Sequence, residues 1–159
     1  MDTNFKKVYD FNKCFGVSVS DAPQKNVFDE NPDLVKLRLS LIQEEVRELE
    51  DAIKDKNFTE VVDALSDILY VVYGAGVSFG IDLDRSFNIV HDSNMSKSCK
   101  TEEEAQQTVE WYKSNDTPYD SPDYRKSDDG KYWVVYNKST GKILKSINYT
   151  PANFKVMLE

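Results

Sequence analysis

Residues 33–55 read DLVKLRLSLIQEEVRELEDAIKD, and residues 58–79 read FTEVVDALSDILYVVYGAGVSF. Apolar residues recur at helical spacing in both stretches, and no proline interrupts either one. Pro32 and Asp33 suit the first turn of the first stretch, and Gly80 is suited to end the second. We therefore predict two long helices, over 33–55 and 58–79.

Shorter elements are predicted on both sides of these helices. Residues 3–15 have helical spacing, whereas residues 16–31 have the Gly, Pro, Asp and Asn content of a loop. A further helix is expected from Asp82, as its N-cap, to about Met95. Thr101-Glu-Glu-Glu104 is typical of a capping box and predicts a helix to about Lys113.

The last part of the chain has a different composition. The stretch Ser114–Asp129 is polar and rich in Pro, Asp and Ser, which predicts a loop or a flexible insertion. Lys131–Tyr136 and Lys142–Ile147 are rich in β-branched and aromatic residues, and Asn137–Gly141 lies between them. This pattern predicts a β-hairpin. A lone hairpin is marginally stable in water, so we expect it to pack on the helical core or on a second subunit.

Together these elements predict an all-α fold, a four-to-five-helix bundle with a C-terminal β-hairpin appendage. We expect a helical core over residues 1–97, a helix with a polar insertion over 98–130, and a hairpin tail over 131–159. The length of 159 residues suits one domain, or one domain with a small appendage.

The charge balance and the cysteine count exclude several classes of function. Twenty-eight acids against twenty bases give a net charge of −8, which disfavours binding to nucleic acid or to anionic lipid. The longest uncharged stretch, from Ile68 to Asp82, is too short to span a bilayer, and the first residues have no signal-peptide pattern. Two cysteines without a CxxC motif and one histidine argue against a disulfide scaffold and a Cys/His zinc site. We expect a reduced, cytoplasmic protein with no membrane partner.

The acidic residues of the first long helix lie on an unexpected face. On a helical wheel at about 100° per residue, Glu45 and Glu48 fall inside the arc of apolar side chains, and Glu44 lies just beyond its edge. An unpaired buried carboxylate costs several kcal/mol unless it takes up a proton. A compensating positive charge is therefore expected near this face.

The second long helix carries its acids on one stripe. The segment between residues 57 and 81 has three charged residues, all acidic and within about 60° of one another: Glu60, Asp63 and Asp67. Tyr70 and Gly74 continue the stripe, and no Lys or Arg lies in the segment. If the two helices face each other, five or six carboxylates meet without a local cation. Such a set of hard oxygen ligands suits Mg²⁺, or alternatively Mn²⁺.

Less specific interpretations are also open from these residues. The stripe on the second helix could be a solvated face, and the acids of the first helix could form surface salt bridges with Arg38, Arg47 or Lys54. The presence of both acidic groups together favours the metal site. A metal held there would polarise a phosphoryl oxygen and activate water.

The same acids form a known motif. Glu44-Glu45-Val-Arg-Glu48 followed by Glu60-Val-Val-Asp63 has the pattern EExxE, a spacer, then ExxD. In this the chain resembles the all-α nucleoside triphosphate pyrophosphatases, the MazG-like and phosphoribosyl-ATP pyrophosphohydrolase-like superfamily. The similarity extends over most of the chain outside 98–130, in these further segments: Phe11–Gly16, Asp63–Gly74, Gly80-Ile-Asp82-Leu and His91-Asp-Ser-Asn94-Met-Ser-Lys97.

The resemblance implies a helical bundle that forms a homodimer or a dimer of dimers. It also implies Mg²⁺-dependent hydrolysis of a nucleoside triphosphate to the monophosphate and pyrophosphate. The metal ligands it implies come from both long helices: Glu45 and Glu48 from the first, and Asp63 with Glu60 or Asp67 from the second. Glu44 is implied either as a further ligand or as the group that orients the attacking water, which makes Glu44, Glu45 and Glu48 the expected catalytic residues.

The resemblance also implies contacts to the substrate. Asn94 and Lys97 are similar to phosphate-contacting residues of the family, although Lys97 could instead simply favour the dipole of a helix end. His91 is implied as a phosphate contact or as a surface or dimer contact. Tyr70 and Asn12 would line the nucleotide pocket or belong to the core.

We therefore expect a house-cleaning nucleotide pyrophosphohydrolase that acts on dUTP or a related deoxynucleotide. The segments Gly80-Ile-Asp82-Leu and Asn94–Lys97 are most similar to family members with such substrates. Phosphoribosyl-ATP is the alternative substrate, because a single helical domain does not separate the two activities. A non-catalytic dimeric module that binds a metal or a nucleotide is the alternative from another class, and turnover would distinguish it.

Overall fold

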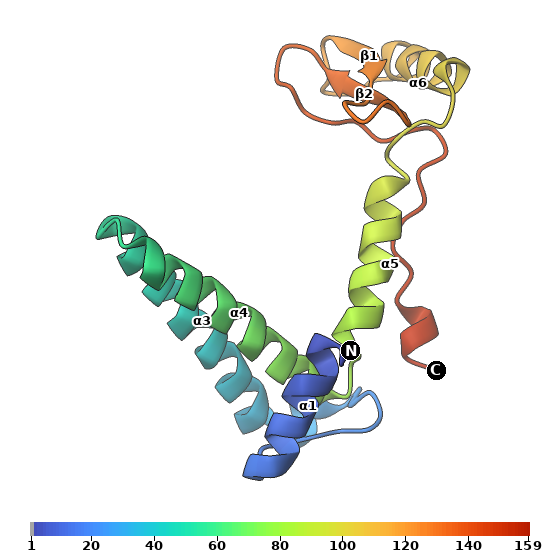
Figure 1. Ribbon diagram of the computed structural model, residues 1–159. Helices are drawn as coiled ribbons and strands as arrows, with labels where there is room; N and C mark the ends of the chain where they lie inside the picture. Colours follow the sequence, from blue (N-terminus) through green and yellow to red (C-terminus); the bar gives the residue numbers. More distant parts are fainter. Residues whose placement is uncertain (1) are drawn as a thin grey trace. The chain divides into compact units, whose positions relative to one another are not determined.

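The computed structural model describes residues 2–159 (Figure 1). Contacts within the chain define two compact units: the described residues up to Phe87 together with Phe154–Glu159, and Asn88–Asn153. The predicted fold class, an all-α bundle with a β-hairpin appendage, is confirmed. The three-part division at residues 97 and 130 stays a prediction.

The first unit is built on a helical hairpin. α3 (Pro32–Lys54) and α4 (Phe58–Phe79) run antiparallel beside each other, and α1 (Asn4–Phe15) packs on α4 (Figure 1). Asparagines start both long helices, because the side-chain oxygens of Asn31 and Asn57 accept the N–H groups of Leu34 and Glu60 at 3.2 and 3.3 Å. The two predicted helices are therefore present with bounds close to those expected.

The segment before α3 packs along the end of α4. The N–H groups of Ser20 and Gln24 donate to the carbonyls of Val77 and Phe79 at 3.0 and 2.9 Å. Gly80 ends α4 with φ of +71°, and a Cβ there would lie 2.0 Å from the carbonyl oxygen of Ala22, so only glycine fits. The expectation of a loop over 16–31 is wrong for one helical turn within it. This turn, α2 (Val27–Glu30), forms because it buries the Val27 side chain.

The helical hairpin leaves much of its apolar surface uncovered in the single chain. On α4, Val62, Leu65 and Leu69 are 51%, 49% and 58% exposed. Leu37 and Ile53, which define part of the apolar arc of α3, are also about half exposed. The expectation that this arc is a buried face is thus wrong for one chain, because a layer of so few helices cannot cover both sides of α3 and α4.

By length and composition alone, α4 could also cross a membrane, since its mean hydropathy reaches 1.4. This is weak support for a membrane span, because a core helix of a soluble protein has the same composition. Three acidic side chains on one stripe and packing against α1 and α3 are features of a helix inside a bundle.

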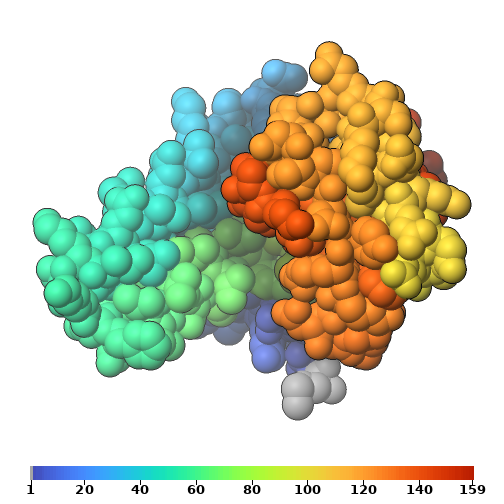
Figure 2. Space-filling model, turned by 90° about the horizontal axis from the view of Figure 1, so that it is seen from above, coloured from blue at the N-terminus to red at the C-terminus, as the bar shows by residue number. Residues whose placement is uncertain are grey.

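The second unit has the more complete core. It begins within α5 (Leu83–Met95) and contains α6 (Glu102–Ser114) and an antiparallel pair of strands, β1 (Pro122–Lys126) and β2 (Trp133–Asn137). A short 3₁₀ helix, η1 (Lys155–Met157), follows it in the chain. The yellow-to-orange part of the chain forms one compact body in Figure 2. Its core consists of fully or nearly fully buried residues: Cys99, Ala105, Val109, Tyr112, Val135 and Leu144.

The predicted helix starts in this region are confirmed. The Asp82 carboxylate accepts the N–H of Arg85 at 3.1 Å, and the Thr101 hydroxyl accepts the N–H of Glu104 at 3.2 Å. The Glu104 carboxylate accepts the N–H of Lys100 at 2.9 Å, which completes a variant of the expected capping box.

The sheet corrects two expectations for the end of the chain. β2 pairs with β1, which lies inside the segment predicted as a loop or flexible insertion, and not with Lys142–Ile147. Residues 142–147 contribute one bridge, between Tyr136 and Ile143. β1 reads PDYRK and lacks an alternating apolar pattern, because it is an edge strand with exposed charges. The turn that joins the strands contains Asp129-Gly130, with Gly130 at φ of +72°, and this dipeptide is the signal that marks the hairpin.

Candidate active site

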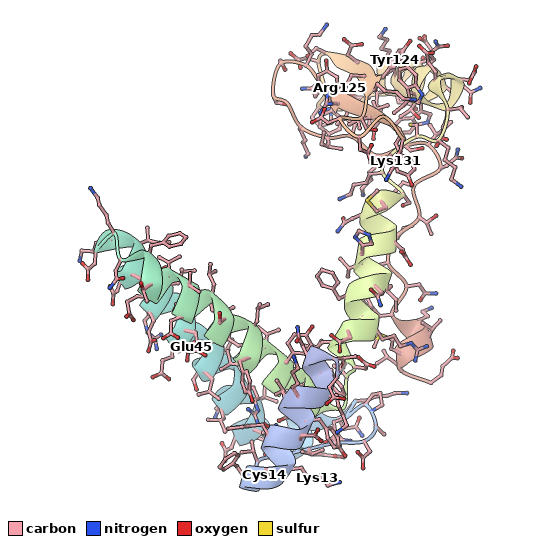
Figure 3. The ribbon with its side chains drawn as sticks, in the orientation of Figure 1. Lys13, Cys14, Glu45, Tyr124, Arg125 and Lys131 are labelled. Atoms are coloured by element: carbon pink, nitrogen blue, oxygen red, sulfur yellow. The ribbon has the colours of Figure 1, made fainter. Side chains whose placement is uncertain are left out.

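The predicted acidic site has Glu45 at its centre, about half-way along α3 (Figure 3). Its Oε2 atom is shielded from solvent and has no hydrogen-bond partner among the described residues. Burial raises the pKa of Glu45, and the negative charges of Glu48, Asp67, Glu44 and Asp63 raise it further. Asp63 and Asp67 lie on α4, so acidic side chains of both helices raise the pKa of the same carboxylate, that of Glu45.

Four of the other five predicted acids lie near enough to Glu45 for their charges to raise its pKa. These four side chains are exposed, and none of the ion pairs recorded among residues 2–159 involves them or Glu45. The interpretation as surface salt bridges with Arg38, Arg47 or Lys54 is therefore wrong for this chain. Glu60 is also exposed, lies about one turn before Asp63, and is not among the charges that raise the pKa of Glu45.

The acidic side chains do not form a complete metal site by themselves. In the described part of the chain, no group of three or more Asp, Glu, His or Cys side chains is close enough to hold a metal by itself. Mg²⁺ is commonly bound through one or two carboxylates and completes its coordination with water and phosphate oxygens. A shielded carboxylate oxygen without a partner, beside four further carboxylates, is an electrostatic setting that such a cation compensates.

Two predicted substrate residues of the first unit have different surroundings. Tyr70 is 41% exposed, and its ring meets that of Phe11 edge-on with 5.5 Å between the centroids. Asn12 is 3% exposed, and its amide donates to the carbonyl of Ser18 at 3.0 Å. The Asn12 side chain thus holds the loop after α1, as expected for the core alternative, while Tyr70 retains free surface.

The remaining predicted substrate residues belong to the second unit. The Lys97 ammonium donates to the Asn94 side-chain oxygen at 2.8 Å, and His91 is exposed on α5. Asn94 and Lys97 line a cavity of about 460 Å³ together with hairpin residues that include Arg125 and Tyr132 (Figure 3 labels Arg125). The volume is in the range of small-molecule sites. Neither Arg125 nor Tyr132 was predicted to lie near Asn94 and Lys97: Arg125 belongs to the segment expected to be a loop, and Tyr132 was assigned only to the hairpin.

Comparison with known proteins supports the motif. A family model described as phosphoribosyl-ATP pyrophosphohydrolase matches residues 8–94, more than half of the chain. The chain belongs to this family. The match runs from α1 to α5, whereas α6 and the hairpin lie outside it. Membership in the phosphoribosyl-ATP pyrophosphohydrolase family implies a nucleotide pyrophosphohydrolase type of activity, and enzymes of this family are generally dependent on a divalent metal and typically soluble.

A viral relative matches the chain over almost its full length. It is an uncharacterized protein of Acanthamoeba polyphaga mimivirus, 33% identical over 242 aligned positions that cover 99% of this chain and 96% of the relative. The similarity therefore includes the hairpin region that the phosphoribosyl-ATP pyrophosphohydrolase model does not match.

One further residue on α3, Arg38, has an environment that we did not predict. Arg38 is 6% exposed, and its Nε and Nη2 atoms are shielded without a hydrogen-bond partner among residues 2–159. Burial lowers its pKa. On the helical wheel used for Glu45, position 38 also falls inside the apolar arc of α3. This position in the sequence could have indicated that Arg38 is buried.

Proposed function

We propose that this protein is a Mg²⁺-dependent nucleoside triphosphate pyrophosphohydrolase that converts dUTP or a related deoxynucleotide to the monophosphate and pyrophosphate. The observation that carries the proposal is the uncompensated carboxylate of Glu45 among four other acids from two helices. A triphosphate carries charge of the same sign as these acids, so a divalent cation is needed between them. We further propose a house-cleaning role in the cytoplasm.

The acids divide into two roles in this proposal. Mg²⁺, or Mn²⁺ in its place, would be held by Glu45 and Glu48 of α3 and by acids of α4, with Asp63 and Asp67 favoured over Glu60 by their action on Glu45. The bound ion would polarise a phosphoryl oxygen and make its water more acidic. Glu44, exposed beside Glu45, would orient the attacking water and accept its proton. Water adds to the α-phosphorus, and the bond to the α–β bridging oxygen breaks.

Substrate contacts are proposed within each unit taken by itself. Lys97, held by Asn94, would offer its charge to a phosphate, and His91 would be either a second phosphate contact or a dimer contact. Tyr70 has free surface on the α4 stripe that carries Asp63 and Asp67, and would contact the nucleoside. Asn12 would act through the loop that it holds after α1.

We also propose that a second copy of the chain covers the open face of α3 and α4. Contiguous apolar patches of this kind mark protein interfaces, and most soluble oligomers pair one patch with its own copy. Phe58, Val62, Leu65 and Leu69 recur at helical spacing on α4 and are all about half exposed or more. The homodimer, alone or as a pair of dimers, would complete the core that one chain lacks.

The test is pyrophosphate release from a panel of dUTP, dCTP, dATP, dGTP, dTTP and phosphoribosyl-ATP, each with Mg²⁺ and with EDTA. We expect release that depends on Mg²⁺ and is fastest with dUTP or a related deoxynucleotide. Glu48→Gln should lose this release. Glu50→Gln is its control, because Glu50 lies on α3 but is not among the charges that raise the pKa of Glu45. Preference for phosphoribosyl-ATP would favour the activity that the family model describes. No release from any nucleotide by folded protein would favour a non-catalytic binding module.

A further inference from the structure

Arg38 is a buried positive charge without a counter-charge in the described chain. Its residue surface is 6% exposed, its Nε and Nη2 atoms are shielded, and no hydrogen bond or ion pair engages it. A guanidinium cannot escape this by losing its proton at physiological pH. Burying an unpaired charge is strongly unfavourable, so the fold retains a costly group here.

The position of Arg38 relates it to the acidic site. Arg38 and Glu45 are seven residues apart on α3, so they share a face and are separated by about 10 Å along the helix axis. On α4, Gly74 is likewise seven residues from Asp67. A Cβ at Gly74 would lie 3.3 Å from Nη1 of Arg38, which places the guanidinium against α4. The seam between the two helices thus carries carboxylates at one level and a guanidinium two turns away.

The guanidinium of Arg38 lies closely against the backbone of α4. Nη1 is its nitrogen nearest to Gly74, and Gly74 is itself buried. A methyl group at Gly74 would crowd this nitrogen, whereas glycine leaves it free. The absence of a side chain at position 74 therefore makes room for the Arg38 guanidinium beside α4.

We propose that Arg38 binds a phosphate group of the substrate. This contact would lie between α3 and α4, about two helical turns from the carboxylates. This inference rests on the proposed function, because the ligand is the polyphosphate of the nucleotide. Arginine is suited to phosphate by its fixed charge and its planar set of donors. The acids attract a cation and repel phosphate, so a substrate with three phosphates requires a basic contact beyond them, and Arg38 supplies it on the same face.

The experiment compares Arg38→Met with the wild-type protein and with Arg47→Met, an exposed arginine of the same helix. Isothermal titration calorimetry with inorganic pyrophosphate in Mg²⁺ measures binding without turnover. Thermal unfolding of the ligand-free protein and sedimentation measure stability and oligomeric state. We expect Arg38→Met to bind pyrophosphate at least tenfold more weakly and to keep or raise the melting temperature, because an uncompensated buried charge is replaced by an apolar chain. Arg47→Met should match the wild type in all three measurements.

Two results would overturn the inference. Unchanged pyrophosphate affinity in Arg38→Met would exclude a phosphate contact, and a lower melting temperature with loss of the oligomer would show that Arg38 pairs with a carboxylate of a second copy. If Arg38→Met does not fold, Arg38→Lys replaces it, with an expected affinity between those of wild type and a charge-free site. Wild-type protein that binds pyrophosphate through Arg38 yet hydrolyses no nucleotide would refute the proposed function and leave this inference standing.

Discussion

Neutralising Glu45 should make the metal-free protein more stable and the metal-bound protein less so. Burial and four neighbouring carboxylates raise the pKa of Glu45 in the folded state. Because the folded-state pKa lies above the unfolded value of about 4.3, ionisation of Glu45 costs stability as the pH rises through and above that value. Glu45→Gln removes this cost at pH 7 and changes nothing below the range in which Glu45 titrates.

The magnitude follows from the partial exposure of the site. The neighbouring carboxylates are exposed, and an interaction between solvent-exposed charges is worth about 0.2–1 kcal/mol. For a protein of this size that amounts to at most about 2–4 °C in melting temperature. Saturating Mg²⁺ should act in the opposite direction, since a ligand at a hundred times its Kd stabilises the wild type by about 2.7 kcal/mol.

Thermal unfolding followed by circular dichroism, with EDTA or Mg²⁺ and between pH 4 and pH 8, tests this prediction. We expect Glu45→Gln to melt above the wild type in EDTA at pH 7, to lose this advantage at pH 4, and to gain little from Mg²⁺. Glu50→Gln serves as the matched change on the same helix. A lower melting temperature of Glu45→Gln in EDTA, or an equal Mg²⁺ increment in all three proteins, would refute the reasoning.

Three further predictions concern the two units separately. Gly76→Ala should lower the free energy of unfolding by about 1–3 kcal/mol, because the new Cβ would lie 2.6 Å from Cγ of Leu83. Urea denaturation measures this loss, and an unchanged midpoint would contradict the prediction. Leu65→Glu should prevent formation of the homodimer, because it places a charge on the open face of α4. If the variant sediments as the same oligomer as the wild type, the dimer interface lies elsewhere. A thiol reagent should modify one cysteine in the native protein and two after denaturation, because Cys14 is exposed and Cys99 is fully buried with a raised pKa; two reactive native thiols would contradict this packing.

Local patterns in the sequence were sufficient for the helices and for the surroundings of Glu45. The apolar period and Gly80 defined α4 as Phe58–Phe79, because the capping and the left-handed end are encoded within a few residues. The helical wheel also placed Glu45 on the face where its carboxylate loses solvent. These features depend on neighbours in the chain, so no tertiary information was required.

Pairing between distant segments was not predictable in the same way. β1 is polar because it is a short edge strand, and only its partner β2 identifies it as a strand. Arg38 was first interpreted as a salt-bridge partner, because spacing alone does not reveal that its guanidinium packs against Gly74 on the other helix. The apolar arc of α3 was expected to be buried, but Leu37 and Ile53 are about half exposed, because an apolar stripe in a sequence does not state which chain covers it.

Product analysis of dUTP hydrolysis by the wild-type protein and by Glu48→Gln tests the central claim most directly. With Mg²⁺, the wild type should release deoxyuridine monophosphate and pyrophosphate in equal amounts, and Glu48→Gln should release neither at a measurable rate. Equal rates for the two proteins, or formation of the diphosphate and inorganic phosphate, would contradict the assignment of the acids on α3 and α4 as the site of pyrophosphate release.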